Sequence, residues 1–451
     1  MAEAQKDRAR LMGEQNIFSL LVKFSVPAVA GMMVQALYNV VDRIYIGRAV
    51  GSLGIAATTV SMPIMMLGFG FALMIGIGAN ALVSIRLGEK RQDLAEKVMG
   101  NACVMLLITS VILTVSGYIF LQPALRLFGA TDSIMPYAMP YMRIIVVGWV
   151  FQMVGFGLNN FIRGEGNPKI AMLTMFIGAF ANMILDPIFI FGFGWGMEGA
   201  AIATIIAQII SAVWVLYYFL GGQSLLKIRP KYFRLEGALV LRILVIGSPP
   251  FVMHVIDSGM AAIWNNQLKF HGGDIAISMM GVIISFMMMN FMFIIGVAQG
   301  TQPIIGYNYG ARQFDRVEKV LFQGILVVTV SGFLAWAIVM IFPAQLVSLF
   351  NKEDQALIEL GERAIRIFFF MLPVLGFQAL SSMFFQSIGK AGHSMFLILS
   401  RTVLFSVPGI LLLPYYFGLD GVWLSTPVSM FSSSLLTAAL LFYTLVQLNR
   451  E

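Results

Sequence analysis

Long apolar stretches, separated by short breaks of charged residues, glycine and proline, run through the sequence from end to end. Twelve of them exceed the roughly 20 residues that a helix needs to cross about 30 Å of hydrocarbon. They lack the two-residue alternation that is typical of membrane β-strands. The pattern therefore predicts an all-α membrane protein with twelve transmembrane helices. The predicted spans are residues 15–46, 52–86, 93–121, 134–162, 169–192, 197–221, 237–268, 275–308, 315–342, 356–387, 393–416 and 419–447.

The second half of the chain repeats a loop signature of the first half at a constant offset. Gly88, Asp93, Glu96, Lys97 and Val98 return as Gly310, Asp315, Glu318, Lys319 and Val320. Six spans per half is an even number, so both halves enter the membrane in the same orientation and should be related by a pseudo-two-fold axis along the membrane normal. We expect two six-helix bundles, residues 1–221 and 237–451, joined by a polar linker at residues 222–236.

Composition indicates that the chain lies in a lipid membrane, and the distribution of charge indicates its orientation there. The chain is 59% hydrophobic and only 11% charged, which leaves too little polar surface for a water-soluble globule. Its net charge of +7 comes from lysines and arginines that gather in the loops of one side, among which we count Arg401. By the positive-inside rule these loops and both termini face the cytoplasm, and the protein lies in the cell (inner) membrane. Topology explains the basic balance, so no nucleic-acid partner is expected.

The sequence does not indicate an enzyme. It contains no GxSxG, HExxH or CxxC motif and no Walker A sequence, and it has only three histidines. The single cysteine, Cys103, excludes an internal disulfide. We therefore expect no cofactor, and an ion gradient of H⁺ or Na⁺ as the source of energy.

A few polar residues interrupt spans where polar groups are costly, and such residues usually face a cavity or a partner. Asp42 lies near the outer end of the first span. Asn182 and Asp186 lie four residues apart on one face of the fifth span, and Thr204 lies about two turns into the sixth. At 1.5 Å per residue Asp42, Asp186 and Thr204 fall in the outer half of the first bundle.

Two carboxylates in a low-dielectric cavity cannot both stay charged cheaply, so they hold a proton or share a cation. Asp42, Asn182, Asp186 and Thr204 are therefore our candidate coupling-ion site for H⁺ or Na⁺. The alternative is that Asp42 pairs with the adjacent Arg43 at the membrane edge and that Asp186 merely ends a helix.

Other polar and soft side chains are candidates for a substrate cavity. Gln35 and Tyr38 share a helix face with Asp42, since they precede it by about two turns and one turn. Met287 lies in a methionine run beside Asn290, and thioethers suit varied hydrophobic cations. The candidates from the spans themselves are Gln35, Tyr38, Asn39, Met287 and Asn290.

Several segments of the chain resemble the multidrug and toxic compound extrusion (MATE) transporters. Residues 38–47 resemble the first-span signature of that family, and residues 163–168 resemble its loop between the fourth and fifth spans. Residues 182–187 and 199–208 resemble its fifth and sixth spans. The resemblance covers essentially the whole chain.

The resemblance implies an N-lobe and a C-lobe around a V-shaped cavity, and efflux of organic cations or amphiphiles against inward H⁺ or Na⁺ flow. It assigns the family's N-lobe ion site to the four residues above and its first-span proline, a gating candidate, to Pro27. The family's C-lobe acid maps onto Asp257, a further substrate-cavity candidate. The tenth span lacks the acid found in one branch of the family, so the resemblance does not extend to that branch's Na⁺ site between spans seven and ten.

Two other classes remain open from the sequence. A flippase for lipid-linked saccharides shares the general architecture, but a pyrophosphate headgroup calls for a basic cavity. A passive channel needs a pore ringed by polar groups, whereas the polar residues here cluster in one half. We expect a monomeric antiporter in contact with membrane lipid, with small organic cations or amphiphiles as its substrates.

Overall fold

The computed structural model describes residues 11–349 and 355–448, and within these ranges every regular element is a helix. We call α2–α7 the N-lobe and α8–α14 the C-lobe. The elements of the N-lobe are α2 (Ile17–Val50), α3 (Ser52–Gly88), α4 (Gln92–Leu127), α5 (Met135–Gly164), α6 (Pro168–Pro187), the π-helix η1 (Ile188–Gly192) and α7 (Gly196–Leu220). Those that follow the linker, in which the 3₁₀ turn η2 (Pro230–Tyr232) lies, are α8 (Gly237–Gly310), α9 (Phe314–Ile341), α10 (Pro343–Ser348), α11 (Gln355–Phe368), α12 (Leu372–Ser387), α13 (Ala391–Leu399), the π-helix η3 (Ser400–Ser406) and α14 (Val407–Leu448).

The twelve predicted spans are confirmed in the described part of the chain. Ten helical runs are long and apolar enough to cross a membrane, and α11 and α12 form one further span bent by 47°. The last of the ten runs, 58 residues from Ala391 to Leu448, is too long for one crossing and breaks at Gly418, so it supplies two spans. The short helix α10 was not predicted; it fills the break between the ninth and tenth spans.

The internal repeat extends to the backbone. Gly51 and Gly273 both adopt positive φ values, of 81° and 65°, and Gly196 and Gly418 do the same at 50° and 57°. Each pair is separated by the offset of the loop signature. Glycine reaches this region without the steric cost that a Cβ imposes. The two halves therefore turn between spans at matching positions.

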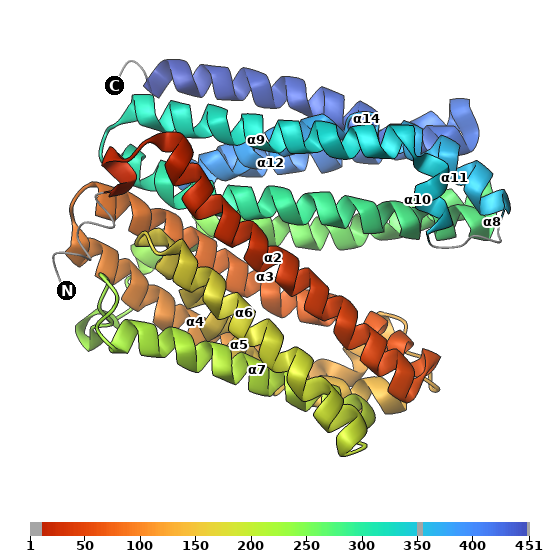
Figure 1. Ribbon diagram of the computed structural model, residues 1–451, viewed down its shortest axis with the longest axis horizontal. Helices are drawn as coiled ribbons and strands as arrows, with labels where there is room; N and C mark the ends of the chain where they lie inside the picture. The colour runs from red at the N-terminus through yellow and green to blue at the C-terminus, as the bar shows by residue number, and fades with distance from the viewer. Residues whose placement is uncertain (1–10, 350–354, 449–451) are drawn as a thin grey trace.

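The lobes share a core at one end of the molecule and separate at the other (Figure 1). One buried apolar cluster contains residues of both lobes, among them Met12, Phe161, Ile304 and Phe385. A second cluster is built from buried residues of the C-lobe and a third from residues of the N-lobe. The shared cluster lies at the end where the chain termini are drawn, which we call the terminal end. Away from this end the two sets of helices diverge.

Glycines let the two lobes touch backbone to backbone at the terminal end. A Cβ added at Gly88 of α3 would overlap the carbonyl oxygen of Tyr307 in α8, and one at Gly310 would overlap that of Ile85. Tyr307 is the repeat equivalent of Ile85, so the two contacts are images of each other. The pseudo-two-fold axis runs between α3 and the second half of α8.

The linker between α7 and α8 is held against α4 of the N-lobe. The side chain of Gln92 donates to the carbonyl oxygen of Leu225 at 2.6 Å. Glu96 forms an ion pair with Arg229, and Lys97 forms one with Glu236, both at 2.6 Å. The polar character that marks this segment in the sequence thus provides partners for the exposed end of α4.

One position from the sequence analysis is corrected. Arg401, which we counted among the loop cations, lies in the π-helix η3 inside the eleventh span. Its charge interacts with that of Asp257 in α8. Charged residues inside a membrane span are tolerated where they face a partner, and a π-helix often marks such a position. Arg401 is therefore not evidence for the orientation of the chain.

Candidate functional site

A polar cluster joins α6 and α7 inside the N-lobe. The amide nitrogen Nδ2 of Asn182 donates to Oδ1 of Asp186 at 3.1 Å and to Oγ1 of Thr204 at 3.3 Å. Asn182 and Asp186 are buried, and their spacing of four residues puts them on one face of α6. Pro187 follows Asp186 directly and leads into η1, because proline has no N–H with which to continue the α-helical pattern.

The helix α2 adds a second carboxylate to this cluster. The carboxyl groups of Asp42 and Asp186 lie close enough for each to act on the charge of the other. Arg43 forms no ion pair with Asp42 in the described structure, since its guanidinium donates to the sulfur of Met62 at 3.2 Å, although its charge still acts on Asp42. The structure therefore brings together all four residues of the candidate coupling-ion site.

Three oxygens of the cluster have no hydrogen-bond donor among the described residues. They are Oδ1 of Asp42, Oδ2 of Asp186 and Oδ1 of Asn182, and all three are buried. Buried acceptors without donors indicate a missing proton, water or cation. Carboxylate, amide and hydroxyl oxygens are also the hard ligands that an alkali cation prefers. The donor set fits a proton shared between the two acids, and it fits Na⁺.

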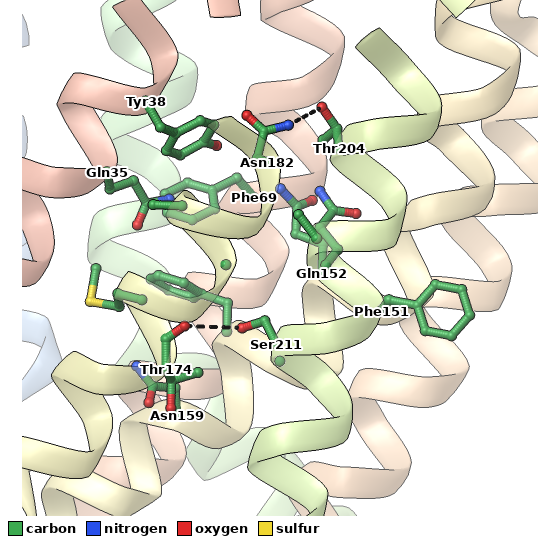
Figure 2. Close-up of a pocket in the computed structure, with 17 residues that line it drawn as sticks. Gln35, Tyr38, Phe69, Phe151, Gln152, Asn159, Thr174, Asn182, Thr204 and Ser211 are labelled. Carbon is green, nitrogen blue, oxygen red and sulfur yellow. Dashed lines mark hydrogen bonds between the residues drawn. The ribbon is translucent and has the colours of Figure 1, made fainter. Parts of the chain in front are cut away.

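A cavity of about 100 Å³ opens directly beside the cluster, between α2, α3, α5, α6 and α7. Asn182, Thr204, Tyr38 and Gln35 lie at one end of it, and Thr174, Ser211 and Asn159 lie at the other (Figure 2). This volume holds several water molecules but is smaller than the roughly 300 Å³ of a drug-sized pocket. In this conformation the cavity thus has room for water molecules and ions but not for a drug-sized compound.

Three lining residues were missed by the sequence analysis. Gln152, Asn159 and Gln208 each leave a buried side-chain carbonyl oxygen without a donor among the described residues. The signal was present in the sequence, since Thr204, Gln208 and Ser211 recur at helical spacing on one face of α7. Buried carbonyl oxygens of this kind are usually satisfied by water, which indicates that the cavity is hydrated.

The remaining candidates from the first span divide between this cavity and its rim. Tyr38 and Gln35 both line the cavity. Asn39 is exposed, does not line the cavity, and donates to the carbonyl oxygen of Gln35 at 2.8 Å. Asn39 therefore contacts the backbone of α2 and not the cavity.

The candidates from the C-lobe lie apart from the N-lobe cavity. Asp257 is exposed on the first half of α8, near Arg401. Met287 packs against the apolar cluster of the C-lobe, and Asn290 keeps a buried carbonyl oxygen without a donor in the described structure. The structure does not bring these three residues to the Asp42–Asp186 cluster.

Pro27 lies buried in α2 where this helix crosses the C-lobe. The residues two before and two after it touch α8: a Cβ at Gly300 would overlap Ser25, and one at Gly296 would overlap Val29. Because proline removes one helix hydrogen bond, the backbone of α2 is least constrained where this helix contacts the C-lobe. Asp42 lies about four turns further along the same helix.

Polar side chains also connect the lobes at the terminal end. Asn80 of α3 donates to Oε1 of Gln302 in α8 at 3.3 Å, and these two residues are repeat equivalents. Arg163, which is 2% exposed, donates to Oε1 of Gln299 and also to Oδ1 of Asn160, the latter at 2.8 Å. The contact between the lobes at this end is therefore both tight and hydrogen-bonded.

Glu165, in the loop between α5 and α6, ties the linker to the N-lobe. It is 2% exposed and accepts hydrogen bonds from the hydroxyls of Tyr218 and Ser224 and from the backbone N–H groups of Leu225 and Leu226. Burial raises the pKa of Glu165 to about 7, and the four donors only partly oppose that rise. This buried acid therefore titrates near neutral pH.

Known families give the same two-part division. The MatE family model matches residues 27–188 and again residues 249–412. The two matched segments begin at Pro27 and Pro249, which are repeat equivalents. The multidrug export protein MepA of Staphylococcus aureus is 26% identical to this chain over 414 residues, which cover 90% of this chain and 89% of MepA.

Solved structures match the fold over nearly its full length. A multidrug resistance MATE family transporter of the MOP superfamily in an outward-facing conformation superposes with a TM-score of 0.92, at 25% identity, over 98% of this chain and 99% of that one. A MOP superfamily transporter from Pyrococcus furiosus gives the same TM-score and identity over 97% and 98% of the two chains. Its description states that the reverse polarity of its binding pocket suggests a different function.

Proposed function

Because the chain belongs to the MatE family of membrane transporters, we propose that it is an antiporter that couples inward flow of H⁺ or Na⁺ to export of cationic or amphiphilic organic compounds. It is a multidrug efflux transporter and not an enzyme. The observation that carries the coupling proposal is the pair Asp42 and Asp186, each of which keeps one buried oxygen without a donor among the described residues, beside a polar cavity.

The terminal end faces the cytoplasm in this proposal, and the protein lies in the cell membrane. Support comes from the cations of the loops at that end, which follow the positive-inside rule once Arg401 is set aside. The lobes touch at the terminal end and diverge away from it, so the conformation corresponds to one open to the outside. We further propose that the single chain is the working unit, since both lobes that meet at the terminal end belong to one chain.

The mechanism follows from the charge of the acid pair. When Asp42 and Asp186 are both ionised, their repulsion favours a cationic substrate or an ion nearby. A proton or Na⁺ that arrives from the outside removes this repulsion and satisfies the orphaned oxygens. Asp42 and Pro27 share α2, and Pro27 lies where α2 contacts α8. A change at the acid pair thereby reaches the contact between the lobes through one helix.

The chemistry of the cavity argues for cations over anionic headgroups. Two acids and several amide and hydroxyl groups line or adjoin it, whereas a flippase for lipid-linked saccharides needs cations for a pyrophosphate. Phe69, Phe156 and Met175 add aromatic and thioether surface to the cavity wall. Such groups attract organic cations through their polarisable faces.

The test is gradient-driven export of ethidium by the purified protein in liposomes, with the proton and sodium gradients imposed separately. We expect one gradient to drive transport. Asp42→Asn should lower the driven rate by at least about tenfold, because it removes the charge that the ion neutralises. Asp132→Asn is the matched control, since that acid lies in an exposed loop. Full driven transport by Asp42→Asn would contradict the proposed coupling site.

A further inference from the structure

A second and larger cavity lies at the terminal end, on the outside of the contact between the lobes. Its volume is about 950 Å³. The loop between α3 and α4 forms one wall, the loop between α8 and α9 forms the other, and Gly13 and Glu14 close a third side. These two loops carry the repeated signature of the sequence. The cavity is therefore centred on the pseudo-two-fold axis and depends on both lobes.

Two cations occupy unusual backbone positions in these loops. Lys90 has a φ of 60° and its repeat equivalent Arg312 a φ of 57°, and they are the only non-glycine residues with positive φ among those described. Each directly follows the end of a helix, where the next N–H bonds back to a carbonyl five residues earlier: Arg91 to Arg86 and Gln313 to Asn308, both at 2.9 Å.

After three other helices of this chain, the residue in the left-handed conformation is a glycine. Gly129, Gly166 and Gly389 hold the equivalent left-handed position, with the same pattern of backbone bonds after α4, α5 and α12. Glycine is favoured there because a side chain is strained at positive φ. Among the described residues, Lys90 and Arg312 are the non-glycine residues that adopt this strained conformation, at repeat-related positions, and both are cations. Backbone strain at a non-glycine residue often accompanies a functional role, which here would belong to the cationic side chain.

No described residue engages the side chains of the loop cations Lys90, Arg91 and Arg312. Within the described residues they form no ion pair or side-chain hydrogen bond, and all three line the cavity. Neighbouring cations are engaged: Arg86 pairs with Glu89 at 2.7 Å. Two acids, Glu14 and Glu89, also line the cavity, and Glu89 is already neutralised by Arg86. The cavity thus presents an excess of positive charge.

We propose that this cavity binds a phosphate-bearing anion, which Lys90 of one lobe and Arg312 of the other hold between them. The phosphate belongs either to an anionic lipid headgroup of the inner leaflet or to a free phosphate ion. The assignment of this end to the cytoplasm rests on the proposed function. Ammonium and guanidinium groups are the side chains that bind phosphate best, through charge-assisted hydrogen bonds.

The anion favours one conformation of the transporter. The two walls stay together only while Gly88 and Gly310 remain packed against the opposite helix. Movement of the lobes toward a cytoplasm-open state separates Lys90 from Arg312 and divides the site. A ligand that binds one state better shifts the population toward it. Phosphate therefore stabilises the cytoplasm-closed state.

The first experiment measures thermal unfolding of the full-length protein in phosphatidylcholine nanodiscs. Sodium phosphate is compared with sodium chloride at equal ionic strength, and in a second arm phosphatidylglycerol replaces part of the lipid. We expect a saturable rise of the unfolding midpoint. In the double variant Lys90→Gly with Arg312→Gly the apparent affinity should fall at least about tenfold, because each cation supplies a charge-assisted bond. Glycine also relieves the backbone strain, so loss of folding does not explain this result.

Two controls accompany it. Arg234→Gln removes an exposed cation from the linker and should keep the full response. The exchange Lys90→Arg with Arg312→Lys keeps both charges and should keep it as well. A response to phosphatidylglycerol alone identifies a lipid as the occupant, and a response to phosphate alone identifies the free ion. An equal response in the double glycine variant, or none in the wild type, would overturn the proposal.

The second experiment reads the conformation directly. Spin labels are attached at Asp93→Cys and Asp315→Cys in a Cys103→Ala background, one at the start of α4 and one at the start of α9. Phosphate should narrow the distribution toward the shorter distance, and the double glycine variant should lose this effect. An unchanged distribution in the wild type would overturn the link to closure. Neither measurement uses ion-driven export, so failure here is separate from failure of the proposed function.

Discussion

The N-lobe and the C-lobe share one backbone plan but place different chemistry on it. In the N-lobe Asp42 approaches Asp186, and Asn182 bridges Asp186 to Thr204. The C-lobe positions equivalent to Asp42, Asn182, Asp186 and Thr204 are Trp264, Leu404, Pro408 and Thr426. Trp264 packs on the rings of Phe368 and Trp423, with centroids 5.8 and 6.5 Å away. An aromatic cluster thus occupies the place of the acid pair.

This difference separates two requirements of a transporter of this kind. The contact between the lobes needs matching surfaces, and there the repeat is kept, as in Gly88 with Gly310 and Asn80 with Gln302. Ion coupling needs only one group of acids, because each extra buried charge costs free energy. One lobe can therefore carry the chemistry while the other repeats the shape.

The largest expected effect tests whether coupling belongs to the N-lobe alone. Asp186→Asn should lower ion-driven ethidium export by at least about tenfold, because the pair loses the group that titrates or binds Na⁺. Asp257→Asn in the C-lobe should leave the driven rate within about threefold of the wild type, since the charge of Arg401 already acts on that carboxylate. Export from proteoliposomes measures both. A larger loss of export in Asp257→Asn than in Asp186→Asn would contradict the assignment of ion coupling to the N-lobe.

Glu165 provides a second difference between the lobes, because Ile388 precedes Gly389 in the C-lobe where Glu165 precedes Gly166. Burial raises the pKa of Glu165 from 4.5 to about 7. The folded protein therefore holds this proton more tightly than the unfolded chain. The resulting stability is present below about pH 4.5 and is lost as the pH rises to about 7, on the order of 3 kcal/mol.

The variant Glu165→Gln stays neutral at every pH, so it lacks this pH-dependent loss of stability. Its unfolding midpoint minus that of the wild type should therefore be larger at pH 8 than at pH 5. Thermal unfolding in nanodiscs across this range measures the difference between the two proteins. The acids in the spans titrate in both proteins and cancel in that comparison. Parallel pH profiles would show that Glu165 does not titrate as described.

The third prediction tests where the lobes are alike. Gly88→Ala and Gly310→Ala should each destabilise the closed contact by about 1–3 kcal/mol, because the added methyl group meets a backbone carbonyl of the other lobe. The two variants should behave alike, since the contacts are images of each other. Distances between spin labels on α4 and α9 report the change. A large effect in only one of them would show that the repeat is not kept at this contact.

The smallest expected effect concerns the edge of the polar cluster. Thr204→Val removes the hydroxyl that accepts from Asn182 at 3.3 Å but keeps the shape of the side chain. A neutral hydrogen bond contributes about 1 kcal/mol, so driven export should fall by a factor of about five. Thr426→Val, at the equivalent C-lobe position, serves as the control and should transport normally. Equal losses in both variants would indicate a packing effect.

The sequence predicts the spans well because their hydrophobicity is local and strong. The repeat predicts the matching turns, since a loop signature is retained wherever two halves must fold alike. Arg401 was misassigned because a charge was taken to mark a loop, whereas its span accommodates it in a π-helix, where its charge interacts with that of Asp257. Gln152 was missed because a single amide in an apolar helix carries little signal until the helices are placed together, whereas Gln208 shares a polar face with Thr204 and Ser211 that the sequence already shows.

Contacts between the halves are beyond what the sequence alone provides. The hydrogen bonds from Arg163 to Gln299 and from Asn80 to Gln302 depend on how the two bundles pack together. Hydrophobic periodicity does not specify this packing. The same holds for the cavity between the loops after α3 and α8. Its residues belong to the repeated signature, but only the fold shows that both copies face one space.

The most direct test of N-lobe coupling is the amount of ion released when substrate binds to the purified transporter. H⁺ and Na⁺ released on addition of ethidium are measured in lightly buffered solution with ion-selective electrodes. We predict release of one of these ions from the wild type and from Asp257→Asn, and none from the double variant Asp42→Asn with Asp186→Asn. Undiminished release from that double variant would contradict the account, because the ion would then bind outside the N-lobe pair.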